Sequence, residues 1–400
     1  MNALYEVITG ILIFWVVIFL LDQLFRLRRF GVEVFPLIVM AKTKRLNRAI
    51  GRIAHKWPRA WKSIWTIGAG VAYVIMGYVL YFLFNNALNF FLAPSQAVPT
   101  FPIIPGITIT GMTLVYFIFP LMIVMLTHEL SHGVAAKVED IPVKSSGVFV
   151  AAVLPGAFVE IDEEKTKEAS PKSRLRIFAA GSFSNLGIAV CAFLLISNLA
   201  VFGGLISPFF GPQQGILIQG TVPDSPIHGQ IIPPFGLFGA SAPDLNLTTI
   251  IESAQDFVEF MDNISPGDTV ILETDMGSIN IITSVNPNNS SRGFVGVQIS
   301  PTFPYYPPRP WGQWLGKAFP YHLYQVLLWT HIIAFSVGIM NLLPIPLFDG
   351  DRMLADALDI LLKKRSPKAG RIILNGFRIF AVSLLILNIS LTVISFPLLF

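Results

Sequence analysis

The run His128-Glu129-Leu130-Ser131-His132 carries the residues of this chain that are best suited to chemistry. It reads H-E-x-x-H, and two residues four apart lie on the same face of an α-helix, so both imidazoles would point the same way. Two ring nitrogens at that spacing suit Zn²⁺, and the carboxylate of Glu129 can act as general base on a metal-activated water. The spacing therefore predicts a zinc site with His128 and His132 as ligands and Glu129 as the base.

The surroundings of the motif favour a metal site over a chance match. In soluble helices an H-E-x-x-H match usually lies on a solvated face, but here the motif follows the apolar run Leu121–Leu126. Polar groups inside a membrane helix cost free energy unless something compensates them. A purely structural polar cluster is the alternative interpretation.

Composition indicates a polytopic α-helical membrane protein. Of 400 residues, 53% are hydrophobic and 13% are charged, whereas soluble proteins carry about 25% charged residues. The length allows about six transmembrane helices and one folded domain of roughly 100 residues. The predicted spans are 6–21, 63–92, 106–136, 175–206, 319–343 and a last one that follows Arg378 and runs to residue 400. The single cysteine, Cys191, excludes an intrachain disulfide.

Charge distribution predicts the orientation in the membrane. Residues 26–62 contain many Lys and Arg and a single acid, Glu33. The positive-inside rule makes this loop cytoplasmic, both termini extracytoplasmic, and the H-E-x-x-H site close to the cytoplasmic side. Attraction to anionic lipid of the bilayer explains the basic loop better than nucleic-acid binding, so no nucleic acid is expected. The apolar stretch Val32–Met40 is too short to span and is expected on the membrane surface.

Gly147–Ile161 follows the motif and is apolar and β-branched, with Pro155-Gly156 as the expected turn. This pattern predicts a β-hairpin rather than a span. Two interpretations remain open: a buried interfacial loop, or a sheet edge that receives an extended peptide.

Four parts follow from these patterns. Residues 1–62 would form the first transmembrane helix and the basic loop, 63–206 the first part of the catalytic core, and 318–400 the second part. Residues 207–317 are rich in Pro, Gly, Ser, Asn and Asp, with short β-prone runs. They predict an extracytoplasmic, mostly β domain.

A hydrolytic zinc site needs a third protein ligand and one open position. Asp349 fits this role because it follows the helix-breaking Pro344 and Pro346 and precedes Gly350. Irregular backbone at membrane depth is tolerated only where protein or a water-filled cavity covers it. Asp351 is the local competitor, and a simple N-cap is the alternative role for Asp349.

These motifs resemble the site-2 protease family, the intramembrane zinc metalloproteases. The resemblance rests on His128-Glu129-x-x-His132, Gly181-x-x-x-Asn185 and Asn341-x-x-Pro344-x-x-x-x-Asp349-Gly350, and it covers about residues 110–400. It implies His128, His132 and Asp349 as zinc ligands and Glu129 as base. It also implies that Asn341 and Asn185 hold substrate or the oxyanion. From the residues alone, Gly181 is expected to serve helix packing, and Asn185 needs a polar partner.

The same resemblance implies that residues 211–301 form a PDZ-type domain, which could bind peptides. The Pro/Gly-rich stretch near Pro233–Pro243 looks like an insertion that departs from the PDZ pattern.

The expected function is cleavage of transmembrane protein substrates within or near their membrane segments, as in regulated intramembrane proteolysis. Two other classes remain. A metal-ion transporter would also place His and Asp at depth, but it should line a path through several helices. An inactive scaffold could bind peptides through its outer domain, but it would not need Glu129.

Overall fold

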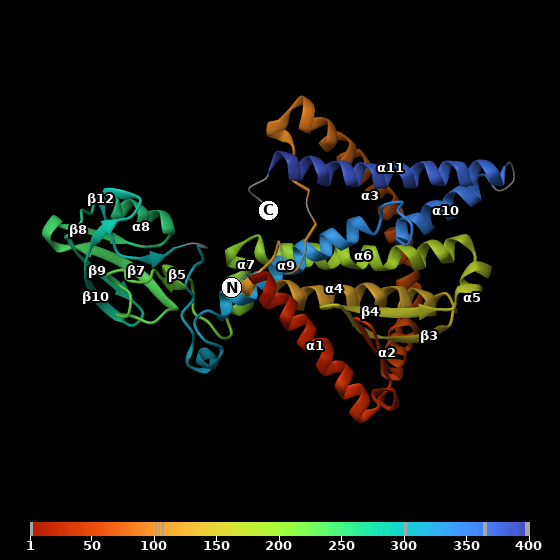
Figure 1. Cartoon of the computed structure of the whole chain (residues 1–400), viewed down its shortest axis with the longest axis horizontal. Coiled ribbons are helices and arrows are strands. Elements are labelled where there is room, and N and C mark those ends of the chain that lie inside the picture. The colour runs from red at the N-terminus through yellow and green to blue at the C-terminus, as the bar shows by residue number, and fades with distance from the viewer. Residues whose placement is uncertain are drawn as a thin grey trace. The chain divides into compact units, whose positions relative to one another are not determined.

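Long apolar helices dominate the computed structural model, which describes residues 3–100, 102–103, 105, 108–299, 302–362 and 366–396 (Figure 1). Within these residues, five helices are long and apolar enough to cross a membrane: α3 (Pro58–Leu92), α4 (Gly111–Val138), α6 (Pro171–Ile196), α9 (Phe319–Met340) and α11 (Pro367–Ser395). They fit a multi-pass membrane protein. The first predicted span corresponds to α1 (Ala3–Phe25). Among the described residues its apolar helix is Thr9–Phe25, which is shorter than the five spans. A sixth span therefore stays a prediction.

The fourth predicted span, 175–206, is wrong in its C-terminal part because the helix breaks. α6 ends at Ile196 and α7 (Leu199–Ile206) starts anew. The side chain of Asn198 accepts a hydrogen bond from the Ala200 amide at 2.8 Å, which caps the new helix. The last helix, α11, begins at Pro367, ahead of the basic residue that was expected to precede it, and residues 397–400 lie outside the described part.

Small residues on α4 let neighbouring elements approach the H-E-x-x-H motif. Ile50 of α2 (Lys44–Lys56) packs against Val134 and Val138 of α4. A Cβ at Gly133 would lie 3.0 Å from Val159 and 3.1 Å from Ile50. These contacts hold α4 between α2 and the strand that contains Val159.

A four-stranded antiparallel sheet lies beside α4, in the order β1-β2-β3-β4 (Figure 1). The strands are β1 (Val32–Phe35), β2 (Ile38–Lys42), β3 (Val143–Ala151) and β4 (Leu154–Ile161). Most of residues 32–40 are strand, and β2 pairs with β3. Their expected place on the membrane surface stays a prediction. The predicted hairpin is confirmed. Because β2 covers β3, β4 is left as an edge strand.

The hairpin turns at Ala152-Val153, where Ala152 adopts a φ of 54°, and not at Pro155-Gly156 as expected. Gly156 lies inside β4 opposite Phe149. A Cβ at this glycine would collide with the Phe149 ring. Close packing of this ring, rather than a turn, explains the glycine.

Residues Leu194–Leu327 form a separate compact unit. Its main sheet has the order β10-β9-β7-β5, with β8 also paired to β7. The helices and strands of this unit, beyond α7 and the start of α9, are β5 (Ile216–Ile218), β6 (Gly220–Thr221), β7 (Phe235–Ala242), β8 (Leu247–Ile250), α8 (Ala254–Met261), β9 (Thr269–Thr274), β10 (Gly277–Ile282), β11 (Ser284–Asn286), β12 (Asn289–Phe294) and β13 (Val297–Gln298). Whether it is a PDZ-type domain stays a prediction.

The stretch Pro233–Pro243, expected as an insertion, supplies β7, which pairs with three other strands. Its departure from the PDZ pattern stays a prediction. Gly236 allows close packing here, because a Cβ at this position would meet the Tyr305 ring at 2.5 Å. The Tyr305 hydroxyl donates to Asp275 at 2.8 Å. Burial and this carboxylate raise the pKa of Tyr305.

In the other unit, a buried polar network joins α3 to α11. Asn86 donates to the Val98 carbonyl at 2.9 Å and to Asn388 Oδ1 at 2.8 Å, and it accepts from the Val98 amide at 2.8 Å. On α11, Arg378 then binds Asp351 of α10 (Asp349–Leu362) at 2.6 Å. The network thus helps to hold the helix that begins with Asp349.

We expect Asn86→Ala to lower the free energy of unfolding by about 1 kcal/mol, because it leaves the buried Asn388 Oδ1 and both backbone groups of Val98 without this partner. Thermal unfolding in detergent measures this effect. Asn85→Ala is the matched control, since Asn85 is exposed on the same helix. Equal midpoints for the two variants would contradict the assigned role of the network.

Candidate metal centre

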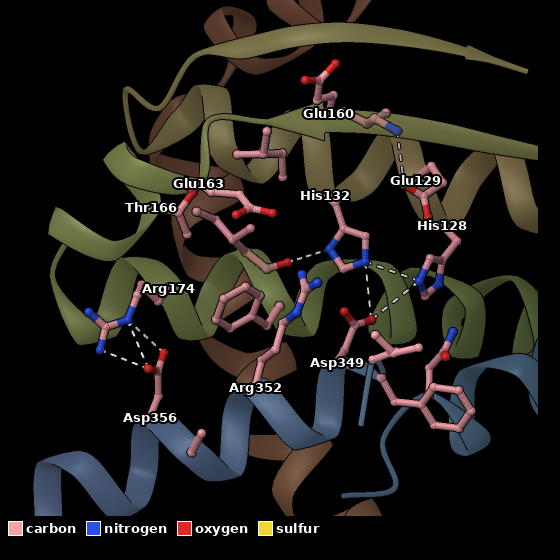
Figure 2. Close-up of a pocket in the computed structure, with 18 of the residues that line it drawn as sticks. His128, Glu129, His132, Glu160, Glu163, Thr166, Arg174, Asp349, Arg352 and Asp356 are labelled. Carbon is pink, nitrogen blue, oxygen red and sulfur yellow. Dashed lines mark hydrogen bonds and ion pairs between the residues drawn. The ribbon is translucent and has the colours of Figure 1, made fainter. Parts of the chain in front are cut away.

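Three side chains from two distant parts of the sequence converge on one point (Figure 2). Nε2 of His128 and Nε2 of His132 are 3.2 Å apart. Oδ2 of Asp349 lies 3.4 Å from the first nitrogen and 3.2 Å from the second. A tetrahedral zinc site with ligand bonds of 2.0–2.1 Å holds its ligand atoms about 3.3 Å apart. The three atoms are therefore spaced as zinc requires.

Burial makes a cation the natural partner of this group. His128, His132 and Asp349 are 4%, 8% and 8% exposed. Within the described residues, Oδ2 of Asp349 is buried without a hydrogen-bond partner. An unpaired buried carboxylate is costly, and a divalent ion at the centre of the three atoms would satisfy it.

The outer ring nitrogens of both histidines also have neighbours. Nδ1 of His132 lies 2.7 Å from the Ile177 carbonyl, to which it can donate when Nε2 faces a metal. Nδ1 of His128 lies 3.0 Å from the amide nitrogen of Asn185, whose Oδ1 is buried and unpartnered. Rotation of that amide places Oδ1 where it accepts from Nδ1–H. The structure thus places Asn185 behind a ligand, where it suits orienting His128.

Gly181 serves close helix packing, as expected, and it does so at the metal-site histidines themselves. A Cβ at this position would collide with His132 Nε2 and would lie 2.7 Å from two atoms of the His128 ring. The glycine lets α6 pass directly against both imidazoles, and its place four residues before Asn185 was the available signal for that location.

The loop between α9 and α10 presents Asp349. The Asn341 carbonyl accepts from the Gly350 amide at 2.8 Å, which closes the loop. A Cβ at Gly350 would collide with the Leu342 carbonyl, so only glycine fits. Asp351, the alternative ligand, instead pairs with Arg378, and the geometry favours Asp349.

Glu129 and Asn341 line a cavity of about 990 Å³ together with the three metal-site residues. Strand β4 forms one wall and α10 another (Figure 2). The Val159 amide of β4 donates to Glu129 Oε2 at 3.2 Å. This bond holds the predicted base at the sheet edge. The arrangement offers a metal site, an adjacent carboxylate and space for a peptide.

Comparison with known proteins supports the interpretation of this site as that of a peptidase. The family model described as peptidase family M50 matches residues 116–387, more than half of the chain. A membrane-bound transcription factor site-2 protease homolog of Arabidopsis thaliana is 28% identical over 196 residues, which cover 48% of this chain and 37% of that protein. An uncharacterized protein of Methanocaldococcus jannaschii is 25% identical over 362 residues, covering 89% of this chain and 86% of the relative. The chain therefore matches little more than a third of the plant protein's length.

We expect Gly181→Ala to abolish stoichiometric zinc binding, because the added methyl group displaces both imidazoles. Elemental analysis of the purified protein measures the metal. Gly187→Ala on the same helix is the control, since a Cβ there meets nothing within 4 Å. Full zinc content in Gly181→Ala would show that α6 does not press on the site.

Proposed function

The chain belongs to peptidase family M50, and on this premise we propose that it is an intramembrane zinc metalloprotease. It would hydrolyse peptide bonds within or near transmembrane segments of other membrane proteins, as in regulated intramembrane proteolysis. The observation that carries the proposal is the convergence of His128, His132 and Asp349 beside Glu129 in a cavity among apolar helices.

Each residue of the site has a defined task in this mechanism. His128, His132 and Asp349 would hold Zn²⁺, which when bound lowers the pKa of a water to about 7 and polarises the scissile carbonyl. Glu129 takes the proton of the attacking water and later delivers it to the leaving amine. Asn341, on the cavity wall, would donate to the developing oxyanion. Asn185 would orient His128 from behind.

The edge of β4 is our candidate for the substrate-binding strand. The Val159 amide points away from β3 toward Glu129, and alternation along a strand directs the amide positions of residues 157 and 155 the same way. Pro155 has no amide hydrogen, and proline is tolerated where that position faces away from the ladder. A transmembrane helix that unwinds locally could pair with this edge as an extended strand. Its scissile bond would then lie between β4 and α10.

Orientation and partners follow from charge. We propose that the site lies towards the cytoplasmic side and that both termini are extracytoplasmic, because the basic loops flank the inner ends of the spans. The unit that contains residues 207–317 would then be extracytoplasmic. There it could bind peptides or restrict access of substrates with bulky outer domains.

We expect Glu129→Gln to eliminate cleavage of a single-span substrate while zinc content stays at the wild-type level, because the amide removes the base and leaves the ligands. Cleavage is followed by gel mobility in detergent or vesicles, and metal by elemental analysis. His128→Ala and Asp349→Ala should lose both. Residual cleavage by Glu129→Gln near the wild-type rate would refute the assigned chemistry. Intact zinc in Asp349→Ala would remove that residue from the ligand set.

Pairing with β4 predicts a register effect in peptide inhibitors. N-methylation blocks a backbone donor, so methylation of alternate residues in one register should weaken inhibition about tenfold, while methylation in the other register should have little effect. Inhibition constants of the two peptides measure the difference. Equal losses in both registers would indicate that substrate does not bind as an added strand.

A further inference from the structure

Arg352 brings a positive charge into the cavity that no step of the mechanism uses. It lines the same cavity as His132 and Asp349. It follows Asp349 by three residues on α10, so the two side chains project on one face of the helix. Figure 2 shows Arg352 pointing from α10 into the cavity beside Asp349.

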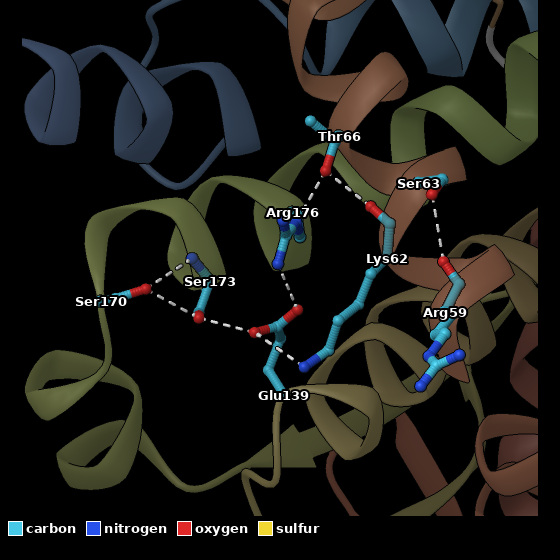
Figure 3. Close-up of polar contacts among 8 residues, drawn as sticks. All are labelled: Arg59, Lys62, Ser63, Thr66, Glu139, Ser170, Ser173 and Arg176. Atoms are coloured by element: carbon cyan, nitrogen blue, oxygen red, sulfur yellow. Dashed lines mark hydrogen bonds and ion pairs between the residues drawn. The ribbon is translucent and has the colours of Figure 1, made fainter.

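Three neighbouring arginines are each engaged by a carboxylate. Arg174 binds Asp356 at 2.9 Å, and Arg378 binds Asp351 at 2.6 Å. Arg176 binds Glu139 at 2.9 Å, and Glu139 also accepts from Ser173 and lies 4.0 Å from Lys62 (Figure 3). These pairs bind helices to one another, so those charges are committed to the fold.

Arg352 differs from them. Among the described residues it forms no ion pair or hydrogen bond. Its contact is the Phe178 ring, whose centroid lies 5.6 Å from the guanidinium carbon. This contact holds the side chain beside α6 without using its donors, since a cation over a ring leaves the edge of the guanidinium free. A guanidinium presents a rigid fork of donors that matches a carboxylate.

No acid that lines the cavity forms an ion pair with Arg352 among the described residues; Glu129 accepts from the Val159 amide, and Glu163 and Asp359 also line the cavity. Asp356 is bound by Arg174, and Glu160 accepts from Ser145 at 2.7 Å. Asp349 faces the two imidazoles. The free cation therefore stands one helical turn from the metal site, on the wall opposite β4.

Resting on the proposed function, we propose that Arg352 is a specificity subsite for an acidic side chain of the substrate. An aspartate or glutamate near the scissile bond, on the part of the extended segment that faces α10, would pair with the guanidinium. The cavity would then select substrates by charge at one position as well as by their ability to unwind.

Binding of short labelled peptides to full-length Glu129→Gln protein in detergent tests this subsite. Each peptide carries one Asp, moved along the sequence one position at a time, beside an Asn counterpart. We expect one Asp position to bind about tenfold more tightly than its Asn partner. Arg352→Gln should remove this preference, and Arg352→Glu should transfer it to Lys at the same position. Lys167→Gln is the control, because Lys167 is a second basic residue lining the cavity.

The subsite would be overturned if the ratio of Asp-peptide to Asn-peptide affinity were the same at every position, with and without Arg352. It would also be overturned if the preference for Asp were lost in Lys167→Gln and kept in Arg352→Gln. Zinc content of each variant shows that the cavity is intact. Cleavage of the same peptides by protein with Glu129 restored is measured separately. Absence of cleavage there would count against the proposed protease, whereas the binding ratios decide the subsite on their own.

Discussion

The cost of placing a carboxylate and two imidazoles among apolar helices is the constraint on which this structure depends. Asp349 cannot stay charged and unpaired in such surroundings, and its free oxygen lies 3.2–3.4 Å from two ring nitrogens. A divalent cation removes the cost for all three groups together. Metal binding and folding of this region should therefore be coupled, as they are in other sites assembled from distant segments.

Much of the remaining architecture serves to bring these atoms together. α4 supplies two of them from one face, and the irregular stretch between α9 and α10 supplies the third. Gly350 closes that stretch, and Gly181 brings α6 against both rings. The ion pair between Arg378 and Asp351 holds α10 from its other side. The glycines allow the helices to approach each other closely, and the ion pair fixes the position of α10. The three polar side chains therefore have little room to move.

The sequence predicted those features whose signal is local. Each of these signals lies within one helical turn or one segment: the H-E-x-x-H spacing, the prolines before Asp349 and the apolar spans. The structure brings the predicted ligands together. Predictions failed where tertiary packing decides. Gly156 suggested a turn, but this glycine lies within a strand and makes room for the Phe149 ring of the neighbouring strand. The pairing of β2 with β3 joins residues about 110 positions apart. The local residue pattern of a strand does not indicate which distant strand it will pair with.

The hydrogen bond between Val159 and Glu129 would link substrate binding to catalysis in the proposed protease. The Val159 amide can serve one strong acceptor, and in this structure that acceptor is the carboxylate of Glu129. A polypeptide that adds to the β4 edge would offer its own carbonyl to the same donor and so compete with the glutamate. Docking would then release the carboxylate from the amide and leave it free to face the attacking water. Without substrate, the hydrogen bond would hold Glu129 at the sheet edge. Only a substrate segment paired with β4 would release it.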